Sequence, residues 1–413
     1  MKTCVIVDAY RFSNDYIHYI SNKHIQCVHV QSTVPPLPDY ARPGGYHAGD
    51  YVANLFYDGN LTLLVKQLKP FNPIAVIAGT EPGVMLADEL SHALSVKSNH
   101  YLLSRARLDK YEMIAALQHA GVRHMKYSKV QNSHEALEWI SKNTHFPVVA
   151  KPLQSAGTDD VFVCATEDEL KEKIEIIIGK KNSLGNTNNS VLIQEFLQGT
   201  EYMVNSVSNH GHHYFTDIWE CQKRYIKGQG MIYDRETLMA SQGEVQTHIT
   251  TYITDVLNAL GIQHGAAHAE LIFTDSGPIL IEVGARVGGN NNRNPHTACL
   301  GVNQLELAVD AYLDEEAYMA KTHHPYRLLK HMTAVLLSTQ QQGKIKAIPL
   351  IQAIEACRSL YWYRLNVRVG DMLRPTQQLY SSPGEVILLN EQYDLIERDY
   401  QDLMRAMEHG FIV

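Results

Sequence analysis

Two glutamates, Glu270 and Glu282, lie in the stretch AAHAELIFTDSGPILIEVGAR, each inside an apolar run that is typical of a strand. The residues between the runs, Asp-Ser-Gly-Pro at 275–278, are a strong hairpin signal. A hairpin centred on Ser276 places the two glutamates directly opposite each other. Like charges opposed at about 5 Å repel, and a bridging cation such as Mg²⁺, usually shared with substrate phosphates, removes that penalty. The alternatives are two exposed glutamates, or a register shifted by one residue that aims the carboxylates to opposite faces.

Two more polar residues occur within apolar strands. His268 shares the face of Glu270 by the alternation of a strand, and it either touches phosphate or substrate or is a satisfied core histidine. Lys151 ends the strand FPVVAK, where a lysine is costly unless its charge is used, although such a side chain can also extend to water. The next loop holds Ser155 and Gly157, whose polar groups suit phosphates. It is not a P-loop, because GxxxxGK[ST] is absent.

These residues need a framework that brings them together. Apolar runs at 3–8, 25–30 and 74–78 alternate with helix-compatible segments and predict a small α/β domain. The third run ends in GTEPGV, which places Glu81 at the cleft beyond the carboxyl ends of the strands. Further short strands and helices follow in the same α/β style, with a polar connector at 180–190.

The composition excludes several classes of protein. With 413 residues, 45% hydrophobic and 19% charged, the chain is an ordinary globular protein of several lobes. Its formal charge of -8 argues against nucleic acid as a partner. No apolar run approaches the roughly 18 residues of a membrane span, and no signal peptide is evident, so we expect a cytoplasmic protein with reduced cysteines. The opening strand lacks GxGxxG, which argues against an NAD-dependent oxidoreductase.

In this order, the elements resemble the ATP-grasp superfamily over roughly residues 95–310, a fold in which two α+β lobes clasp ATP. The resemblance implies that Glu270 and Glu282 carry Mg²⁺, or Mn²⁺ in its place. Residues 282–284 read Glu-Val-Gly and lack the asparagine that often supplies a last ligand, which leaves the number of metal ions open. The implied contacts with ATP are Lys110, Lys151, Ser155 and Gly157 for the phosphates, main-chain groups of Glu195 and Leu197 for adenine, and Glu201 for ribose.

Four stretches are more narrowly similar to the L-amino acid ligases, or dipeptide synthetases: AGTEPGVMLADEL, RLDKYEM, KPLQSAGTDDV and HAELIF…ILIEVGARVGG. The resemblance implies an enzyme that joins two unprotected amino acids through an acyl phosphate and releases ADP and phosphate. Asp160 stands where that family usually has glycine. Arg286, with Lys151, is then the expected catalytic group on the transferred phosphate. The candidates for the amino-acid pocket are Glu81, Ser155, His268, Arg286, Asn290 and Arg293.

The implied fold combines α/β and α+β parts. Residues 1–95 form an N-terminal α/β domain, 96–188 a central lobe with a phosphate-covering loop, and 189–413 a second lobe with a C-terminal subdomain from about 325. We expect amino acids as small-molecule substrates, no membrane partner and a homodimer. The alternatives are another ATP-grasp carboxylate–amine ligase or a carboxylase, of the purine-pathway or biotin-carboxylase type, and a module that holds nucleotide without chemistry.

Overall fold

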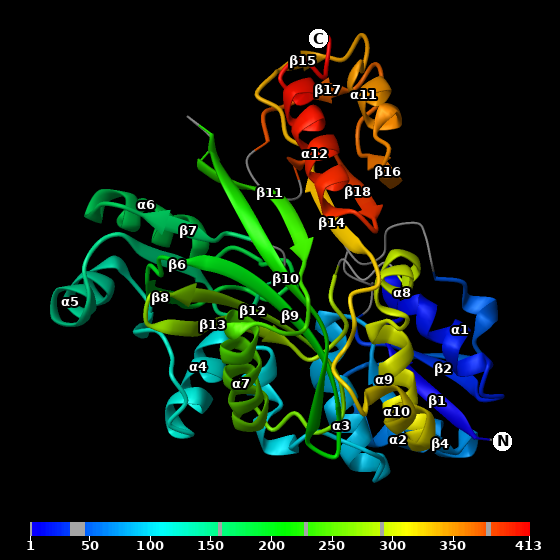
Figure 1. Ribbon diagram of the computed structural model, residues 1–413. Helices are drawn as coiled ribbons and strands as arrows, with labels where there is room; N and C mark the ends of the chain where they lie inside the picture. The colour runs from blue at the N-terminus through cyan, green and yellow to red at the C-terminus, as the bar shows by residue number, and fades with distance from the viewer. Residues whose placement is uncertain (1, 34–45, 156–158, 227–229, 290–292, 377–380) are drawn as a thin grey trace.

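The computed structural model describes residues 2–33, 46–155, 159–226, 230–289, 293–376 and 381–413. Within these ranges the chain forms two four-stranded sheets, one eight-stranded sheet and one small two-stranded sheet. Figure 1 shows the eight-stranded sheet crossing the middle of the molecule, with the N-terminal sheet on one side of it and the second four-stranded sheet on the other.

The N-terminal sheet is parallel and has the order β3-β2-β1-β4. Alternate residues of β1 pack into two different cores: Cys4 and Ile6 toward α1 and α9, and Val5 and Val7 toward α2 and α3. A sheet covered on both faces explains the unbroken apolar run in the sequence. The elements are β1 (Thr3–Val7), α1 (Tyr16–Ser21), β2 (Gln26–Gln31), β3 (Ala53–Phe56), α2 (Leu61–Leu68), β4 (Pro73–Ala78) and α3 (Val84–Leu94).

The second four-stranded sheet is antiparallel, with the order β5-β8-β6-β7. Its helices begin at side-chain caps: Asp109 accepts from backbone N–H groups at the start of α4, Asn132 at the start of α5 and Thr166 at the start of α6. The elements are α4 (Lys110–His119), β5 (Tyr127–Val130), α5 (Ser133–Asn143), β6 (Val148–Pro152), β7 (Phe162–Cys164), α6 (Glu167–Ile177) and β8 (Val191–Glu195). The sequence predicted that the central lobe ends at residue 188. Strand β8 lies beyond that limit, yet it is an inner strand of this sheet.

The eight-stranded sheet has the order β13-β12-β9-β10-β11-β14-β18-β16, so strands of the C-terminal block continue the sheet that holds the two glutamates. Its strands are β9 (Thr200–Asn209), β10 (His212–Ile226), β11 (Gly230–Leu238), β12 (Gly265–Thr274), β13 (Gly277–Gly284), β14 (His331–Leu336), β16 (Leu360–Leu365) and β18 (Gly384–Asn390). The remaining elements are α7 (Glu244–Ala259), α8 (Arg293–Leu300), α9 (Gln304–Leu313), α10 (Glu315–Thr322), α11 (Leu350–Ala356), α12 (Tyr393–Met407), β15 (Gly343–Lys344) and β17 (Met372–Leu373).

The predicted mixture of α/β and α+β parts is confirmed, while the predicted domain limits stay a prediction. All six cysteines are buried and unpaired, as expected of reduced cysteines. In the described part of the chain, no helix has the length and apolar character needed to cross a membrane.

Candidate active site

The hairpin of β12 and β13 brings Glu270 and Glu282 together. The pairing expected from the sequence is confirmed, because Glu270 lies directly opposite Glu282. The turn, however, consists of residues 275–276 and is not centred on Ser276. From the turn to the pair of Leu271 and Leu280, the register therefore differs by one residue from the register expected for a hairpin centred on Ser276. Ile281 is an extra residue, a β-bulge, that shifts the register back. The bulge therefore decides that both carboxylates lie on one face of the sheet.

Lys110 holds one of these carboxylates in place. It is the first residue of α4, and its Nζ lies 2.8 Å from Glu282 Oε2 and donates to the carbonyl oxygen of Ser155 at 2.8 Å. Burial by itself would lower the pKa of Lys110, but the neighbouring charge of Glu282 outweighs it and raises the pKa. Lys110 therefore carries a positive charge at neutral pH and joins the hairpin to the segment that follows β6.

Lys151 is a second buried lysine without such a partner. It lies on β6 and lines the same cavity, and its ammonium group makes no hydrogen bond or ion pair with another described residue. Burial and the nearby charge of Lys110 lower its pKa to about 8, against the opposing influence of Glu282 and Glu270. A buried ammonium with no anion beside it is costly, so this position suits a ligand that brings negative charge.

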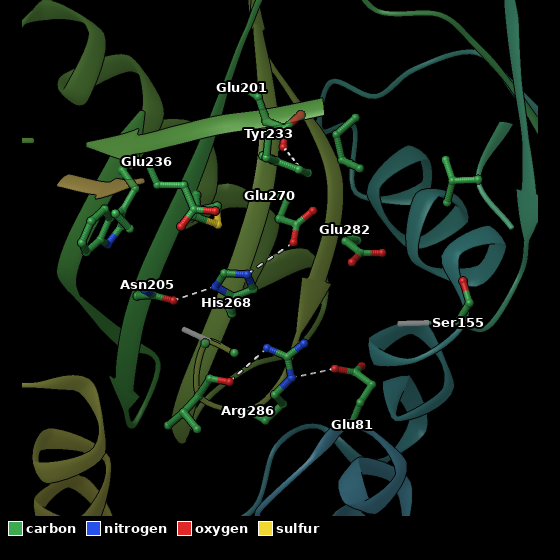
Figure 2. A pocket seen from close by; sticks show the side chains of 18 of the residues that line it. Glu81, Ser155, Glu201, Asn205, Tyr233, Glu236, His268, Glu270, Glu282 and Arg286 are labelled. Atoms are coloured by element: carbon green, nitrogen blue, oxygen red, sulfur yellow. Dashed lines mark hydrogen bonds and ion pairs between the residues drawn. The ribbon is translucent and has the colours of Figure 1, made fainter. Parts of the chain in front are cut away.

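His268 and Glu270 are joined on the same face of β12. The Nε2 atom of His268 lies 3.4 Å from Glu270 Oε1, and its Nδ1 is hydrogen-bonded to Asn205 Oδ1 at 2.8 Å (Figure 2). Burial opposes the charged form of Glu270, but the contact with His268 lowers the pKa of this carboxyl well below its usual value. Glu270 is therefore a charged carboxylate at the centre of the cavity.

Arg286 meets Glu81 across the cavity. Its Nε lies 2.8 Å from Glu81 Oε2, and its Nη1 donates to the carbonyl oxygen of Val287 at 3.0 Å (Figure 2). Glu81 follows β4 of the N-terminal domain, so the pair connects that domain to the large sheet. A Cβ atom on Gly284 would lie 2.8 Å from Glu81 Oε2 and 3.0 Å from Arg286 Cζ. Gly284 stands where asparagine often supplies a last metal ligand in the ATP-grasp superfamily. Because it has no side chain, it leaves room for this ion pair.

The other end of the cavity contains the residues predicted to meet adenosine. Glu201 accepts from Lys223 Nζ at 2.5 Å and from the Tyr233 hydroxyl at 2.6 Å. Leu197 lines the cavity, whereas the Glu195 side chain accepts from the backbone N–H of Lys126. The N–H of Glu195 donates to Lys126 O, so a main-chain contact of Glu195 with a base would have to use its carbonyl group.

The cavity has a volume of about 430 Å³, within the roughly 300–1,000 Å³ of typical ligand sites. Glu195, which was predicted to contact adenine, is not among the residues that line it. The structure brings together Glu81, Lys110, Lys151, Ser155, Leu197, Glu201, His268, Glu270, Glu282 and Arg286. Gly157, Asn290 and the side chain of Arg293 lie outside the part of the chain that the structure describes.

Several lining residues were not anticipated from the sequence. Lys223 and Tyr233 lie on β10 and β11 beside Glu201, and Met332 and Ile387 come from C-terminal strands. Gln194 is buried, and its Oε1 has no hydrogen-bond partner in the described part of the chain. Among these five unanticipated residues, only Lys223, a charge in a strand-like run, could have been noticed from the sequence alone.

The site fits ATP with a divalent cation. The carboxylate pair offers hard oxygen ligands, and the buried lysines suit phosphates. Among the described residues no group of three or more His, Cys, Asp or Glu side chains is placed to hold a metal ion. A cation held by Glu270 and Glu282 would therefore complete its coordination with phosphate oxygens or water.

Comparison with known proteins agrees with this geometry. A family model described as an ATP-grasp domain matches residues 144–293. Dapdiamide A synthase of Enterobacter agglomerans is 32% identical over 419 residues, which cover 99% of this chain and 96% of that protein. The crystal structure of an L-amino acid ligase from Bacillus licheniformis is similar in fold, with a TM-score of 0.74 at 17% identity over 98% of this chain and 97% of that one. Phosphoribosylglycinamide synthetase from Anaerococcus prevotii gives a TM-score of 0.66 at 14% identity, over 100% and 99%.

Two lobes that close on a nucleotide-sized cavity with a carboxylate pair and two lysines define an ATP-grasp enzyme. Within that superfamily the chain belongs to the L-amino acid ligase family, and it is an ATP-dependent carboxylate–amine ligase.

Proposed function

We propose that this enzyme joins two unprotected L-amino acids into a dipeptide and converts ATP to ADP and phosphate. The observation that carries the proposal is the convergence of Glu270, Glu282, Lys110, Lys151 and Arg286 in one cavity between the lobes. Full-length similarity to dapdiamide A synthase supports an amino acid as a substrate. A homodimer remains part of the proposal.

The first step is phosphoryl transfer. A carboxylate oxygen of one amino acid attacks the γ-phosphorus of ATP, and the bond from that phosphorus to the β-phosphate oxygen breaks, giving an acyl phosphate and ADP. In this proposal Lys110 and Lys151 hold the phosphates and Arg286 neutralises the transferred group, which their positive charges in the cavity support. Mg²⁺ bound by Glu270 and Glu282 would neutralise phosphate charge and align the reacting oxygens.

The second step forms the peptide bond. The other amino acid, after its ammonium group has lost a proton to solvent, attacks the acyl carbon with its amine nitrogen. The carbon–oxygen bond to phosphate breaks, and the second proton of the nitrogen passes to the released phosphate. Glu81 and Arg286 face each other in the cavity. Their charges are complementary to a substrate that brings an ammonium group to Glu81 and a carboxylate or phosphate to Arg286.

Oxygen labelling tests this route. If the carboxylate of the activated amino acid carries ¹⁸O, one labelled oxygen must appear in the released phosphate, because the acyl carbon–oxygen bond breaks in the second step. Unlabelled phosphate would contradict activation as an acyl phosphate. Phosphate release that requires bicarbonate and no amino acid would favour the carboxylase alternative.

A further inference from the structure

A buried chain of polar side chains runs from β10 to the cavity. The carboxylate of Asp217 receives three donors: Asn205 Nδ2 at 2.5 Å, Trp219 Nε1 at 2.6 Å and Thr216 Oγ1 at 2.8 Å. Asp217 is 1% exposed and Asn205 5% exposed, and Asn205 lines the cavity. The chain continues from Asn205 to His268 and from there to Glu270 (Figure 2).

The direction of each hydrogen bond in this chain is determined by chemistry. A carboxylate only accepts, so the amide nitrogen of Asn205 must face Asp217. The amide oxygen of Asn205 then faces His268, and an oxygen can only accept, so Nδ1 of His268 must carry the hydrogen. This holds whether the imidazole is neutral or charged. Nε2 is therefore the one ring nitrogen left to face Glu270 and the cavity.

Gly288 covers the link between Asn205 and His268. A Cβ atom at this position would lie 2.9 Å from Asn205 Oδ1 and 3.1 Å from His268 Nδ1, so a side chain would press on the hydrogen bond itself. The N–H of Gly288 donates to Gln304 Oε1 at 2.9 Å, and Gln304 Nε2 donates to the carbonyl oxygens of Ala267 at 2.9 Å and Ser206 at 3.1 Å. Gln304 thus ties the glycine segment to β12 and β9, the strands that carry His268 and Asn205.

We propose that Asp217 and Asn205 are positioning residues that hold the ring of His268 with Nδ1 tied back and Nε2 presented to the reacting groups. Outer partners of this kind fix the tautomer and orientation of a functional histidine, and their loss typically costs about 10- to 100-fold in activity or affinity. The effect on ligation rests on the proposed function. The orientation of the ring does not.

The first test is nuclear magnetic resonance of protein labelled with ¹⁵N at histidine. The His268 signal is identified by its loss in His268→Gln. We expect a hydrogen on Nδ1 that exchanges slowly with water, because Asn205 accepts it and Gly288 covers it. The slow exchange should vanish in Asn205→Ala and persist in Asp217→Asn, since an asparagine oxygen at the Oδ1 position still accepts from Asn205 and Trp219. A wild-type Nδ1 without hydrogen would overturn the inference, even if ligation proceeds as proposed.

The second test is steady-state kinetics. Asn205→Ala should lower kcat by about 10- to 100-fold and change KM for ATP less than about threefold. Asn209→Ala is the matched control, because Asn209 lies on the same strand, is buried and does not line the cavity. If Asn205→Ala does not fold, Gly288→Ala tests the same hydrogen bond. The positioning role would be overturned if Asn205→Ala had the same kcat as Asn209→Ala. If Asn205→Ala does not fold, the same comparison applies to Gly288→Ala. If ATP cleavage by the wild-type enzyme does not depend on amino acids, the proposed function is refuted. The resonance test of the His268 ring remains valid in that case.

Discussion

Arg286 Nε lies 2.8 Å from Glu81 Oε2, and this ion pair joins the large sheet to the N-terminal domain. The two residues are 205 positions apart in the chain, yet both line the same cavity. The pair gives each residue a double task. We propose that Glu81 orients Arg286 before substrate binds and that its carboxylate also meets the incoming ammonium group.

Glu81→Gln should therefore harm the use of amino acids more than the use of ATP. The amide keeps the shape but removes the charge that holds Arg286, and truncating one partner of a buried charge pair costs about 2–5 kcal/mol. We expect kcat/KM for the amino acids to fall at least about 30-fold, with KM for ATP within about threefold. Glu315→Gln, on the exposed side of α10, is the control. Equal losses for ATP and amino acids would contradict this division of roles.

Gly284→Ala should disturb the same ion pair without destabilising the fold. The added Cβ would meet Glu81 Oε2 and Arg286 Cζ, both at the ends of side chains that can move away. Replacing a glycine that is not in a left-handed conformation costs little, and it stabilises proteins by about 0.4–1 kcal/mol in favourable cases. We expect kcat to fall about tenfold, an ion-pair loss of about 1.4 kcal/mol, while the urea midpoint stays unchanged or rises. Wild-type turnover would show that the position of the pair does not matter.

Glu282→Gln should abolish turnover and leave the chain folded. The change removes one of two opposed carboxylates and also the partner of the buried Lys110. The apparent affinity for Mg²⁺, measured by titration of the metal at saturating ATP, should fall together with kcat. Glu408→Gln, at an exposed glutamate after α12, should behave as wild type. Near-normal turnover of Glu282→Gln would remove the metal assignment.

The affinity for ATP should fall at alkaline pH because of Lys151. Its pKa of about 8 lies below that of a free lysine, so its charge is present below pH 8 and is lost above it. An added phosphate favours the charged form, and ATP binding above pH 8 must therefore take up a proton. Calorimetry without amino acids should show a Kd for ATP that rises up to about tenfold per pH unit above pH 8. Lys151→Arg should remove this rise of the Kd above pH 8, since arginine stays charged. A Kd for wild type that is constant from pH 7 to 9.5 would contradict the assignment.

The sequence predicted the pairing of Glu270 and Glu282 because strand alternation and a turn signal are local properties. The bulge at Ile281 was not predictable, since no local residue preference marks it. Without it, the actual two-residue turn would have placed the carboxylates on opposite faces. The predicted pairing is correct because two differences cancel. The predicted turn centre, Ser276, lies half a residue from the actual centre, which displaces the register by one residue, and the bulge shifts the register back by one residue.

Contacts between distant segments were beyond the sequence. The resemblance to a known family assigned roles to Glu81 and Arg286, but their direct ion pair depends on how the N-terminal domain packs against the large sheet. The same holds for Met332 and Ile387, because nothing local indicates that β14 and β18 extend the sheet to the cavity. The polar chain from Asp217 to His268 depends on the register of three neighbouring strands.

In the proposed reaction the enzyme ligates two amino acids and cleaves the terminal phosphate from ATP. The most direct measurement is phosphate release from ATP and Mg²⁺ across all pairs of the common amino acids, with each product identified by mass. We predict release that depends on the pair and yields ADP together with a dipeptide. Formation of AMP and pyrophosphate, or phosphate release that needs no amino acid, would exclude ligation of amino acids through an acyl phosphate.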